Sequence, residues 1–312
     1  MLTSFTLLVL SLVALYIGAD WLVKGSSSLA LRAKISPLVV GLTVVAFGTS
    51  APELVVSISS VLNGQGNIAI GNIMGSNIFN VCMILGVAAM IYPLQAKRQL
   101  TRMDIPLMIL ASIIFVIFFW GGRLERWQGG LFVVGIIAYL LFSFYLSRKE
   151  QKEQEVELQE LLRPWYVDLF YIVSGLCILV FGSQLLIDNA TVIAKSMGVS
   201  EAVIGLTIVA AGTSMPELAT SVVAALKKNP EIALGNVVGS NLFNILAIAG
   251  ITSLVHPIEA PSVNYIDLLV MLTMSLVLLP LAWTQNRISR GEGTFLVLVY
   301  VGYTLWLLRD LV

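Results

Sequence analysis

The stretch "GLTVVAFGTSAPEL" (residues 41–54) returns later in the chain as "GLTIVAAGTSMPEL" (residues 205–218). A second stretch, "IAIGNIMGSNIFN" (68–80), returns as "IALGNVVGSNLFN" (232–244). One constant offset aligns both pairs without a gap from Gly18/Gly182 to Gly86/Gly250, and more than half of positions 41–80 are identical to their partners. The chain therefore contains an internal repeat. Each copy places a glutamate directly after a proline inside an apolar segment.

The composition is that of an integral membrane protein. Hydrophobic residues make up 58% of the 312 positions and charged residues only 12%, against about 25% in soluble domains. The first apolar segment is too long for a signal-peptide core and lacks a basic start, so we expect a retained span. The zero net charge indicates no nucleic-acid partner, and no obligate protein partner is evident. With His256 as the single histidine, histidine-based metal chemistry is not expected.

Ten apolar stretches are long enough to cross a bilayer, which takes about 20 residues. Backbone groups find no water in lipid and the stretches lack the alternation of a barrel, so we expect an all-α membrane protein with ten transmembrane helices. These cover roughly residues 2–23, 37–61, 68–92, 103–120, 127–147, 165–187, 201–225, 231–256, 264–284 and 292–309. The polar stretch 148–164 separates a first five-helix repeat (1–147) from a second (165–312).

An odd number of spans in each copy means that the second copy enters the membrane from the opposite side. The lysines and arginines agree, because 14 of the 18 lie in loops on one predicted side, which includes the 148–164 linker. Positive loops stay cytoplasmic, so we expect a cytoplasmic linker, both termini outside, and a multi-pass protein of the cell membrane. An inverted repeat is typical of a secondary transporter, whose binding site lies at the interface between the repeats near the midplane.

The two glutamates after the prolines, Glu53 and Glu217, lie near the middle of the second and seventh predicted spans. An ionised side chain at that depth costs from about 3 kcal/mol upward. A buried Lys or Arg would offset this cost, but the second, third, seventh and eighth spans contain no basic residue away from their ends. The compensating charge must come from outside the protein, which indicates a bound cation.

The prolines themselves add oxygen ligands. Pro52 has no N–H, and its ring clashes with the carbonyl of Gly48, four residues earlier. We therefore expect the carbonyls around residues 46–49 to leave the helical hydrogen-bond pattern, and Pro216 to do the same for residues 210–213. Non-helical backbone at membrane depth is tolerated only where it faces protein or a watery cavity.

The following spans carry amide and hydroxyl side chains at helical spacing. Asn72, Ser76 and Asn80 share one helix face, and their repeat partners are Asn236, Ser240 and Asn244. Helix packing alone is an alternative role for these residues, above all for Asn72, Asn236, Asn77 and Asn241. The expected site contains only oxygen ligands, which suits calcium, and several sodium ions could meet the same two carboxylate charges.

At these motifs the chain resembles the cation/calcium antiporter superfamily, close to the prokaryotic sodium/calcium exchangers. The resemblance covers nearly all ten spans, and residues 41–80 and 205–244 look like that family's alpha-1 and alpha-2 motifs. It implies Ca²⁺ and Na⁺ as transported substrates without a cofactor, and two helices, the first and sixth spans, that slide across a static core. It further implies a calcium site of Glu53 and Glu217 with the carbonyls of Thr49 and Thr213, sodium sites of Ala46, Thr49, Ser50 and Ser76 and of Ala210, Thr213, Ser214 and Ser240, and Asn80 and Asn244 at the centre.

One departure from that family is informative. Some relatives have an aspartate at one of the two central positions, whereas this chain has Asn80 and Asn244. The charge of the site is therefore at most that of two carboxylates. A calcium/proton antiporter on the same scaffold is the nearest alternative function. A cation channel and an intramembrane enzyme are more distant ones, and the sequence predicts no covalent catalysis.

Overall fold

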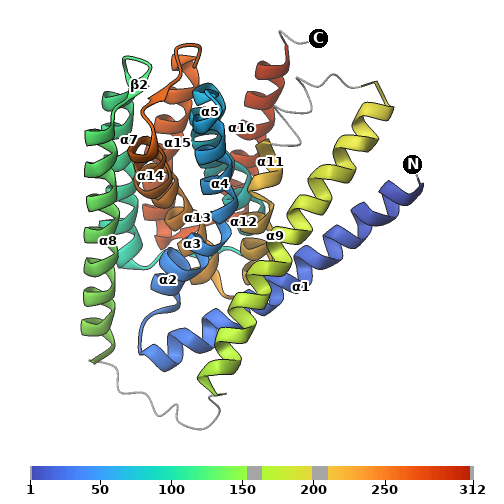
Figure 1. The fold of residues 1–312 in the computed structure, drawn as a ribbon. Coiled ribbons are helices and arrows are strands. Elements are labelled where there is room, and N and C mark those ends of the chain that lie inside the picture. Colours follow the sequence, from blue (N-terminus) through green and yellow to red (C-terminus); the bar gives the residue numbers. More distant parts are fainter. Residues whose placement is uncertain (1, 153–163, 199–209, 310–312) are drawn as a thin grey trace.

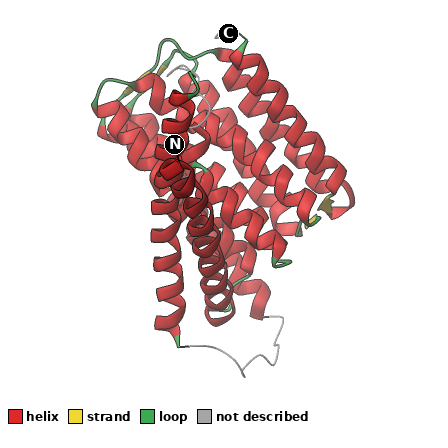
Figure 2. Ribbon diagram, turned by 90° about the vertical axis from the view of Figure 1, so that its right-hand side faces the viewer, coloured by secondary structure: helices red, strands yellow, loops and turns green. Residues whose placement is uncertain are grey.

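The computed structural model describes residues 2–152, 164–198 and 210–309, which form an almost entirely helical protein (Figures 1 and 2). Within these ranges, eight helical stretches are apolar and long enough to cross a membrane. They are Thr3–Ala33, Gly66–Ile91, Leu100–Phe119, Arg126–Ser147, Trp165–Ser196, Pro230–Val255, Tyr265–Trp283 and Arg290–Leu308. A ninth consists of Pro37–Thr49 and Ala51–Leu62, which meet at an angle of 44°. The predicted span 201–225 lies partly outside the described residues, and its described part includes the apolar helix Met215–Leu226.

The first half of the chain contains most of its elements in the second and third spans. In chain order they are α1 (Leu2–Ala33), α2 (Pro37–Val40), the π-helical turn η1 (Gly41–Val45), α3 (Ala46–Thr49), α4 (Ala51–Leu62), α5 (Gly66–Phe79), η2 (Asn80–Ile84), α6 (Leu85–Ile91), β1 (Leu94–Gln95), η3 (Leu100–Asp104), α7 (Ile105–Phe119), β2 (Arg123–Leu124) and α8 (Arg126–Lys152).

The second half follows the same order where it is described. Its elements are α9 (Trp165–Ser196), α11 (Ala210–Thr213), α12 (Met215–Leu226), α13 (Pro230–Leu242), η5 (Phe243–Ala249), α14 (Gly250–Val255), β3 (Ile258–Glu259), α15 (Tyr265–Trp283), η6 (Thr284–Asn286), β4 (Arg287–Ile288) and α16 (Arg290–Leu308). Two short antiparallel strand pairs join the halves, because β1 pairs with β4 and β2 pairs with β3.

Helices α1 and α9 run obliquely side by side along one flank of the molecule (Figure 1). Each is 32 residues long, or about 48 Å, which exceeds a hydrocarbon core of about 30 Å. The predicted span ends at residues 23 and 187 are therefore wrong, because the two helices continue to Ala33 and Ser196. Within α1, Lys24 forms an ion pair with Asp20, one helical turn earlier, with Nζ and Oδ2 2.7 Å apart.

Glycines let these two helices approach closely. A Cβ atom built on Gly175 would lie 2.7 Å from the backbone nitrogen of Leu22 and 2.8 Å from the carbonyl oxygen of Gly18. Both contacts are shorter than real Cβ atoms make, so only glycine fits here. The same device recurs in the core, where a Cβ on Gly235 would lie 2.6 Å from the carbonyl oxygen of Leu38. Small residues thus bring backbones together where lipid provides no hydrophobic driving force.

The centre of the protein is built from the segments that carry the repeated motifs. Helix α13 packs against α2, η1 and α3, while α5 packs against α4, α11 and η5. Nearly every residue of α13 is buried, whereas α16 buries only Gly293 and Leu296. The polar residues of α13, which include Asn236, Ser240 and Asn241, therefore lie in the interior of the protein.

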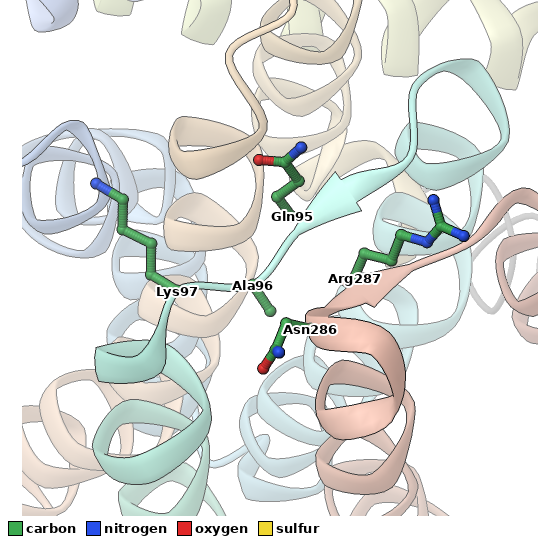
Figure 3. Close-up of a pocket in the computed structure, with 5 residues that line it drawn as sticks. All are labelled: Gln95, Ala96, Lys97, Asn286 and Arg287. Atoms are coloured by element: carbon green, nitrogen blue, oxygen red, sulfur yellow. The ribbon is translucent and has the colours of Figure 1, made fainter.

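The start of α1 and the end of α16 lie toward one end of the molecule, and the end of α8 and the start of α9 lie at the other (Figure 1). A surface pocket of about 600 Å³ lies beside β1 and β4 and is lined by Gln95, Ala96, Lys97, Asn286 and Arg287 (Figure 3). None of the repeated motif residues lines it. This pocket is therefore distinct from the predicted cation site, and its Lys97 forms an ion pair with Glu231, with Nζ and Oε2 2.8 Å apart.

Candidate cation site

Both "GTSxPE" motifs interrupt a helix at the serine. Helix α3 ends at Thr49 and α4 begins at Ala51, with Ser50 between them at φ −85° and ψ 5°. Its repeat partner Ser214 separates α11 from α12 with φ −90° and ψ 10°. Each proline stands in the first turn of the second helix, where its missing N–H costs least. Glu53 and Glu217 share those first turns, so both carboxylates lie at positive helix N-termini.

Fewer backbone carbonyls leave the helical hydrogen-bond pattern than the sequence analysis predicted. The carbonyl of Ala46 is not released, because it accepts a hydrogen bond from the N–H of Ser50 at 3.0 Å. A proline removes the donor only for the carbonyl four residues earlier, which is Gly48 for Pro52 and Gly212 for Pro216. The carbonyl of Gly212 accepts the hydroxyl of Ser183, on α9, at 2.6 Å. The hydroxyl of Thr49 also lies 3.3 Å from the Ala46 carbonyl oxygen, so this carbonyl has two donors within hydrogen-bond distance.

The two glutamates are held by serines of the opposite half of the chain. The hydroxyl of Ser214 donates to Oε1 of Glu53 at 3.1 Å, and that of Ser50 donates to Oε1 of Glu217 at 2.9 Å. Both glutamates are only 1% exposed. The second carboxylate oxygen of each is buried and accepts no hydrogen bond from the described residues. No Lys or Arg of the described ranges forms an ion pair with either carboxylate.

Further oxygens without donors gather in the same part of the core. Oδ1 of Asn80 and Oδ1 of Asn244 are buried and accept no hydrogen bond from the part of the chain that the structure describes. Ser76 lies one helical turn before Asn80, and its Oγ is 3.1 Å from the Ser214 hydroxyl that reaches Glu53. Buried polar atoms almost always have a partner, so these acceptors without donors are candidate ligands of a cation.

Asn72 and Asn236 brace the broken helices. Nδ2 of Asn72 donates to the carbonyl of Glu53 at 3.2 Å and to Oγ of Ser57 at 3.0 Å. Its Oδ1 lies 3.5 Å from the hydroxyl of Thr213, which belongs to the other half.

Asn236 makes the matching set of contacts. Its Nδ2 donates to the carbonyl of Glu217 at 3.2 Å and to Oγ of Ser221 at 3.0 Å, and its Oδ1 accepts the hydroxyl of Thr49 at 3.2 Å. Each asparagine therefore fixes its own glutamate's backbone and ties it to the opposite half.

Comparison with known proteins gives the family. The family described as "Sodium/calcium exchanger protein" matches twice, over residues 3–145 and 167–309. The chain belongs to this family. The sodium/calcium exchanger MaX1 of Methanosarcina acetivorans is 32% identical over 96% of this chain and 97% of its own length. Inner membrane protein YrbG of Escherichia coli K12 is 35% identical over 98% of this chain and 96% of its own length.

A solved structure supports the same conclusion for the fold. The sodium-calcium exchanger NCX_Mj, soaked with 2.5 mM Na⁺ and 1 mM Sr²⁺, superimposes with a TM-score of 0.84 and 31% identity. The match covers 96% of each chain. The exchanger family is thus shown by sequence and by fold, and the chain is a multi-pass membrane protein.

The structure brings most of the predicted site residues of this exchanger together. Glu53 is in contact with Ser214, and Glu217 with Ser50. The hydroxyl of Thr49 contacts Asn236 and that of Thr213 contacts Asn72, the two asparagines that hold the backbones of the glutamates. The backbone of Ala210 begins α11, and Ser240 is buried in α13. What the sequence missed are the contacts that orient these groups: the bracing role of Asn72 and Asn236, and hydrogen bonds of Asn77 and Asn241. The repeated "GSN" motif was the available signal for the latter pair.

Proposed function

We propose that this chain is a secondary antiporter that exchanges sodium for calcium across the plasma membrane by alternating access. The observation that carries the proposal is the pair of buried glutamates, each with one carboxylate oxygen lacking a donor and neither with a basic partner among the described residues. Two carboxylate charges are neutralised by one calcium ion or by several sodium ions. Competition between the two ions for the same carboxylates is what exchange requires.

The ligands we propose are those that the resemblance to the exchanger family implies. Calcium would bind Glu53 and Glu217 with the carbonyls of Thr49 and Thr213. Sodium would bind in two related places, one formed by Ala46, Thr49, Ser50 and Ser76 and the other by Ala210, Thr213, Ser214 and Ser240. Asn80 and Asn244 would lie between them and present Oδ1. The serine contacts that cross between the halves support a single site shared by both.

The mechanism follows from the charge of the site. Without ions, two carboxylates at membrane depth cost from about 3 kcal/mol each. That cost opposes an occluded crossing by the empty protein, whereas either ion set removes it. The site then passes from one side to the other only when loaded, which couples the two fluxes. Ions bind and leave without covalent chemistry, so we assign no enzymatic activity and no cofactor.

We propose that the ten spans form two inverted repeats, over 1–147 and 165–312, joined by the cytoplasmic linker 148–164, with both termini outside. The double family match over 3–145 and 167–309 supports two copies. The strand pairs β1–β4 and β2–β3 support it too, because the repeat offset converts one pair into the other. Labelling of single cysteines at the termini and in the linker with a membrane-impermeant reagent tests the orientation.

The function is tested by calcium uptake into proteoliposomes at fixed pH. An outward sodium gradient is expected to drive uptake, and replacing internal sodium by choline is expected to abolish it. Uptake that ignored sodium but followed an imposed pH gradient would overturn the proposal in favour of a calcium/proton antiporter. Calcium entry without any counter-ion gradient would indicate a channel.

A further inference from the structure

Two asparagines that are not among the proposed ligands occupy the centre of the molecule. Asn77 and Asn241 are repeat partners, 2% and 1% exposed, and each lies three residues before a central ligand, Asn80 or Asn244. Nδ2 of Asn80 donates to Oδ1 of Asn241 at 3.0 Å. Nδ2 of Asn244 donates to Oδ1 of Asn77 at 3.2 Å. Each central amide is thus held by the other half of the chain.

The orientation of the Asn77 and Asn241 amides is fixed because the NH₂ group of each faces a group that can only accept a hydrogen bond. Nδ2 of Asn241 donates to the backbone carbonyl of Asn77 at 3.4 Å, so its Oδ1 must point the other way, toward Asn80. Nδ2 of Asn77 is 3.6 Å from the thioether sulfur of Met271, which also accepts and cannot donate. Neither amide can turn over without setting two acceptors against each other.

The fixed orientation of these amides determines which atoms Asn80 and Asn244 present to the candidate cation site. Because Asn80 and Asn244 must use Nδ2 toward their partners, the Oδ1 atom of each faces elsewhere, and both Oδ1 atoms are buried without a donor in the described residues. An asparagine amide could present either its oxygen or its NH₂ group to a site, and only the oxygen binds a cation. We propose that Asn77 and Asn241 are positioning residues that force Asn80 and Asn244 to present oxygen to the transported cation. This inference rests on the proposed function and deepens it.

The decisive experiment compares Asn241→Leu in two backgrounds, with Ca²⁺ binding to purified protein measured by titration calorimetry at one alkaline pH. In the wild-type background we expect Asn241→Leu to weaken Ca²⁺ binding by about 10–100-fold, the usual effect of removing a residue that orients a metal ligand. Asn189→Leu is the matched control, because that amide is also buried and, among the described residues, bonds only within its own helix, to the carbonyl of Leu185. It is expected to leave binding unchanged.

In the Asn80→Asp background, Asn241→Leu is no longer expected to weaken Ca²⁺ binding. A carboxylate presents oxygen in either orientation, so it needs no positioning, and it meets Oδ1 of Asn241 as acceptor against acceptor. Asn241→Leu removes that conflict, so the double variant is expected to bind Ca²⁺ at least as tightly as Asn80→Asp alone. A role of Asn241 in packing alone predicts the same loss in both backgrounds, and that result would overturn the proposal.

Folding of each variant is checked by size-exclusion chromatography in detergent. If Asn241→Leu does not give monodisperse protein, Asn241→Ser replaces it, because a serine hydroxyl is one atom too short to hold Asn80. Wild-type protein that bound no Ca²⁺ would overturn the proposed function and this inference together. Wild-type protein that bound Ca²⁺ while Asn241→Leu bound it equally well would overturn the inference alone.

Discussion

We propose that a carboxylate at membrane depth is tolerated here because a bound cation neutralises its charge. The environment of Glu53 offers one serine hydroxyl, a helix N-terminus and no basic residue of the described ranges, and that of Glu217 is the same. These groups lower the cost of the charge without cancelling it. A full counter-charge from a lysine or arginine would bind the carboxylate permanently and exclude the cation, so partial stabilisation suits a site that must release its ion.

This balance predicts opposite effects of Glu53→Gln and Glu217→Gln on stability and on transport. Each substitution removes an uncompensated buried charge, so we expect the melting temperature in ion-free detergent solution to be unchanged or higher. Ca²⁺ is expected to raise the melting temperature of wild type by mass action, and this increase is expected to disappear in both variants, together with sodium-driven calcium uptake.

The matched control is Glu259→Gln, which neutralises a glutamate that is exposed and paired with Arg123. It is expected to behave as wild type in both measurements. Wild-type calcium uptake by either Glu53→Gln or Glu217→Gln would refute the central role of the carboxylates.

At the scale of helices, sequence and structure agree best where hydrophobicity alone decides. The apolar stretches outside 201–225 were found to within a few residues, except that α1 and α9 run on to Ala33 and Ser196. Their extensions contain polar residues, and hydropathy cannot show that these contact other parts of the protein. Ser27, for example, accepts a hydrogen bond from Asn229 at 3.1 Å. The two-residue strands escaped prediction because only the pairing of distant segments creates them.

The candidate site likewise has features that could be predicted from the sequence and features that could not. The glutamates, prolines and repeated polar positions are local features, so their placement in the core could be predicted from the sequence. The orientation of the asparagine amides could not, because it depends on hydrogen bonds between residues more than 160 positions apart. The carbonyl of Ala46 was predicted wrongly because the proline effect was extended beyond the one carbonyl that it governs.

The contact between α1 and α9 leads to a prediction for Gly175→Ala. The added methyl would meet the backbone of Leu22 and Gly18 at 2.7 and 2.8 Å, and neither backbone can move without separating the helices. We expect a destabilisation of about 1–3 kcal/mol and slower exchange. Gly302→Ala in α16 is the control, because nothing lies within 4 Å of its added methyl. It is expected to be neutral or to stabilise by up to about 1 kcal/mol. Equal melting temperatures and exchange rates for the two variants would contradict this account.

At the scale of the whole molecule, the two halves have similar sequences. The contacts that each half makes with helices α1 and α9 differ between the halves. Lys227, at the end of α12, forms an ion pair with Asp20 of α1 and donates to its carbonyl at 3.3 Å. Ser183 of α9 donates to the carbonyl of Gly212. The repeat offset converts Lys227 and Asp20 into Asn63 and Gln184, and Ser183 into Ala19, so none of these contacts has a chemical equivalent in the other half.

This asymmetry bears on alternating access, which we propose proceeds by α1 and α9 moving together against the core. In an inverted repeat, that movement exchanges the environments of the two halves. The opposite state would then rely on Asn63 with Gln184, a neutral pair, in place of the ion pair of Lys227 with Asp20. The arrangement described here is therefore expected to be the more populated one when no ion is bound.

The asymmetry predicts that Lys227→Asn, which installs the residue found at the equivalent position in the first half, brings the two states closer in free energy. Lys227 and Asp20 are 29% and 17% exposed, so the pair is partly screened and its loss is expected to shift the ratio of the states by about two- to fivefold. Spin labels on α1 and α13, in protein lacking Cys82 and Cys177, report the ratio as two distances. Lys228→Asn is the control, because this neighbour has the left-handed backbone that asparagine also adopts, at φ 56°. A distance distribution that responded equally to both substitutions, or to neither, would show that this ion pair does not set the balance.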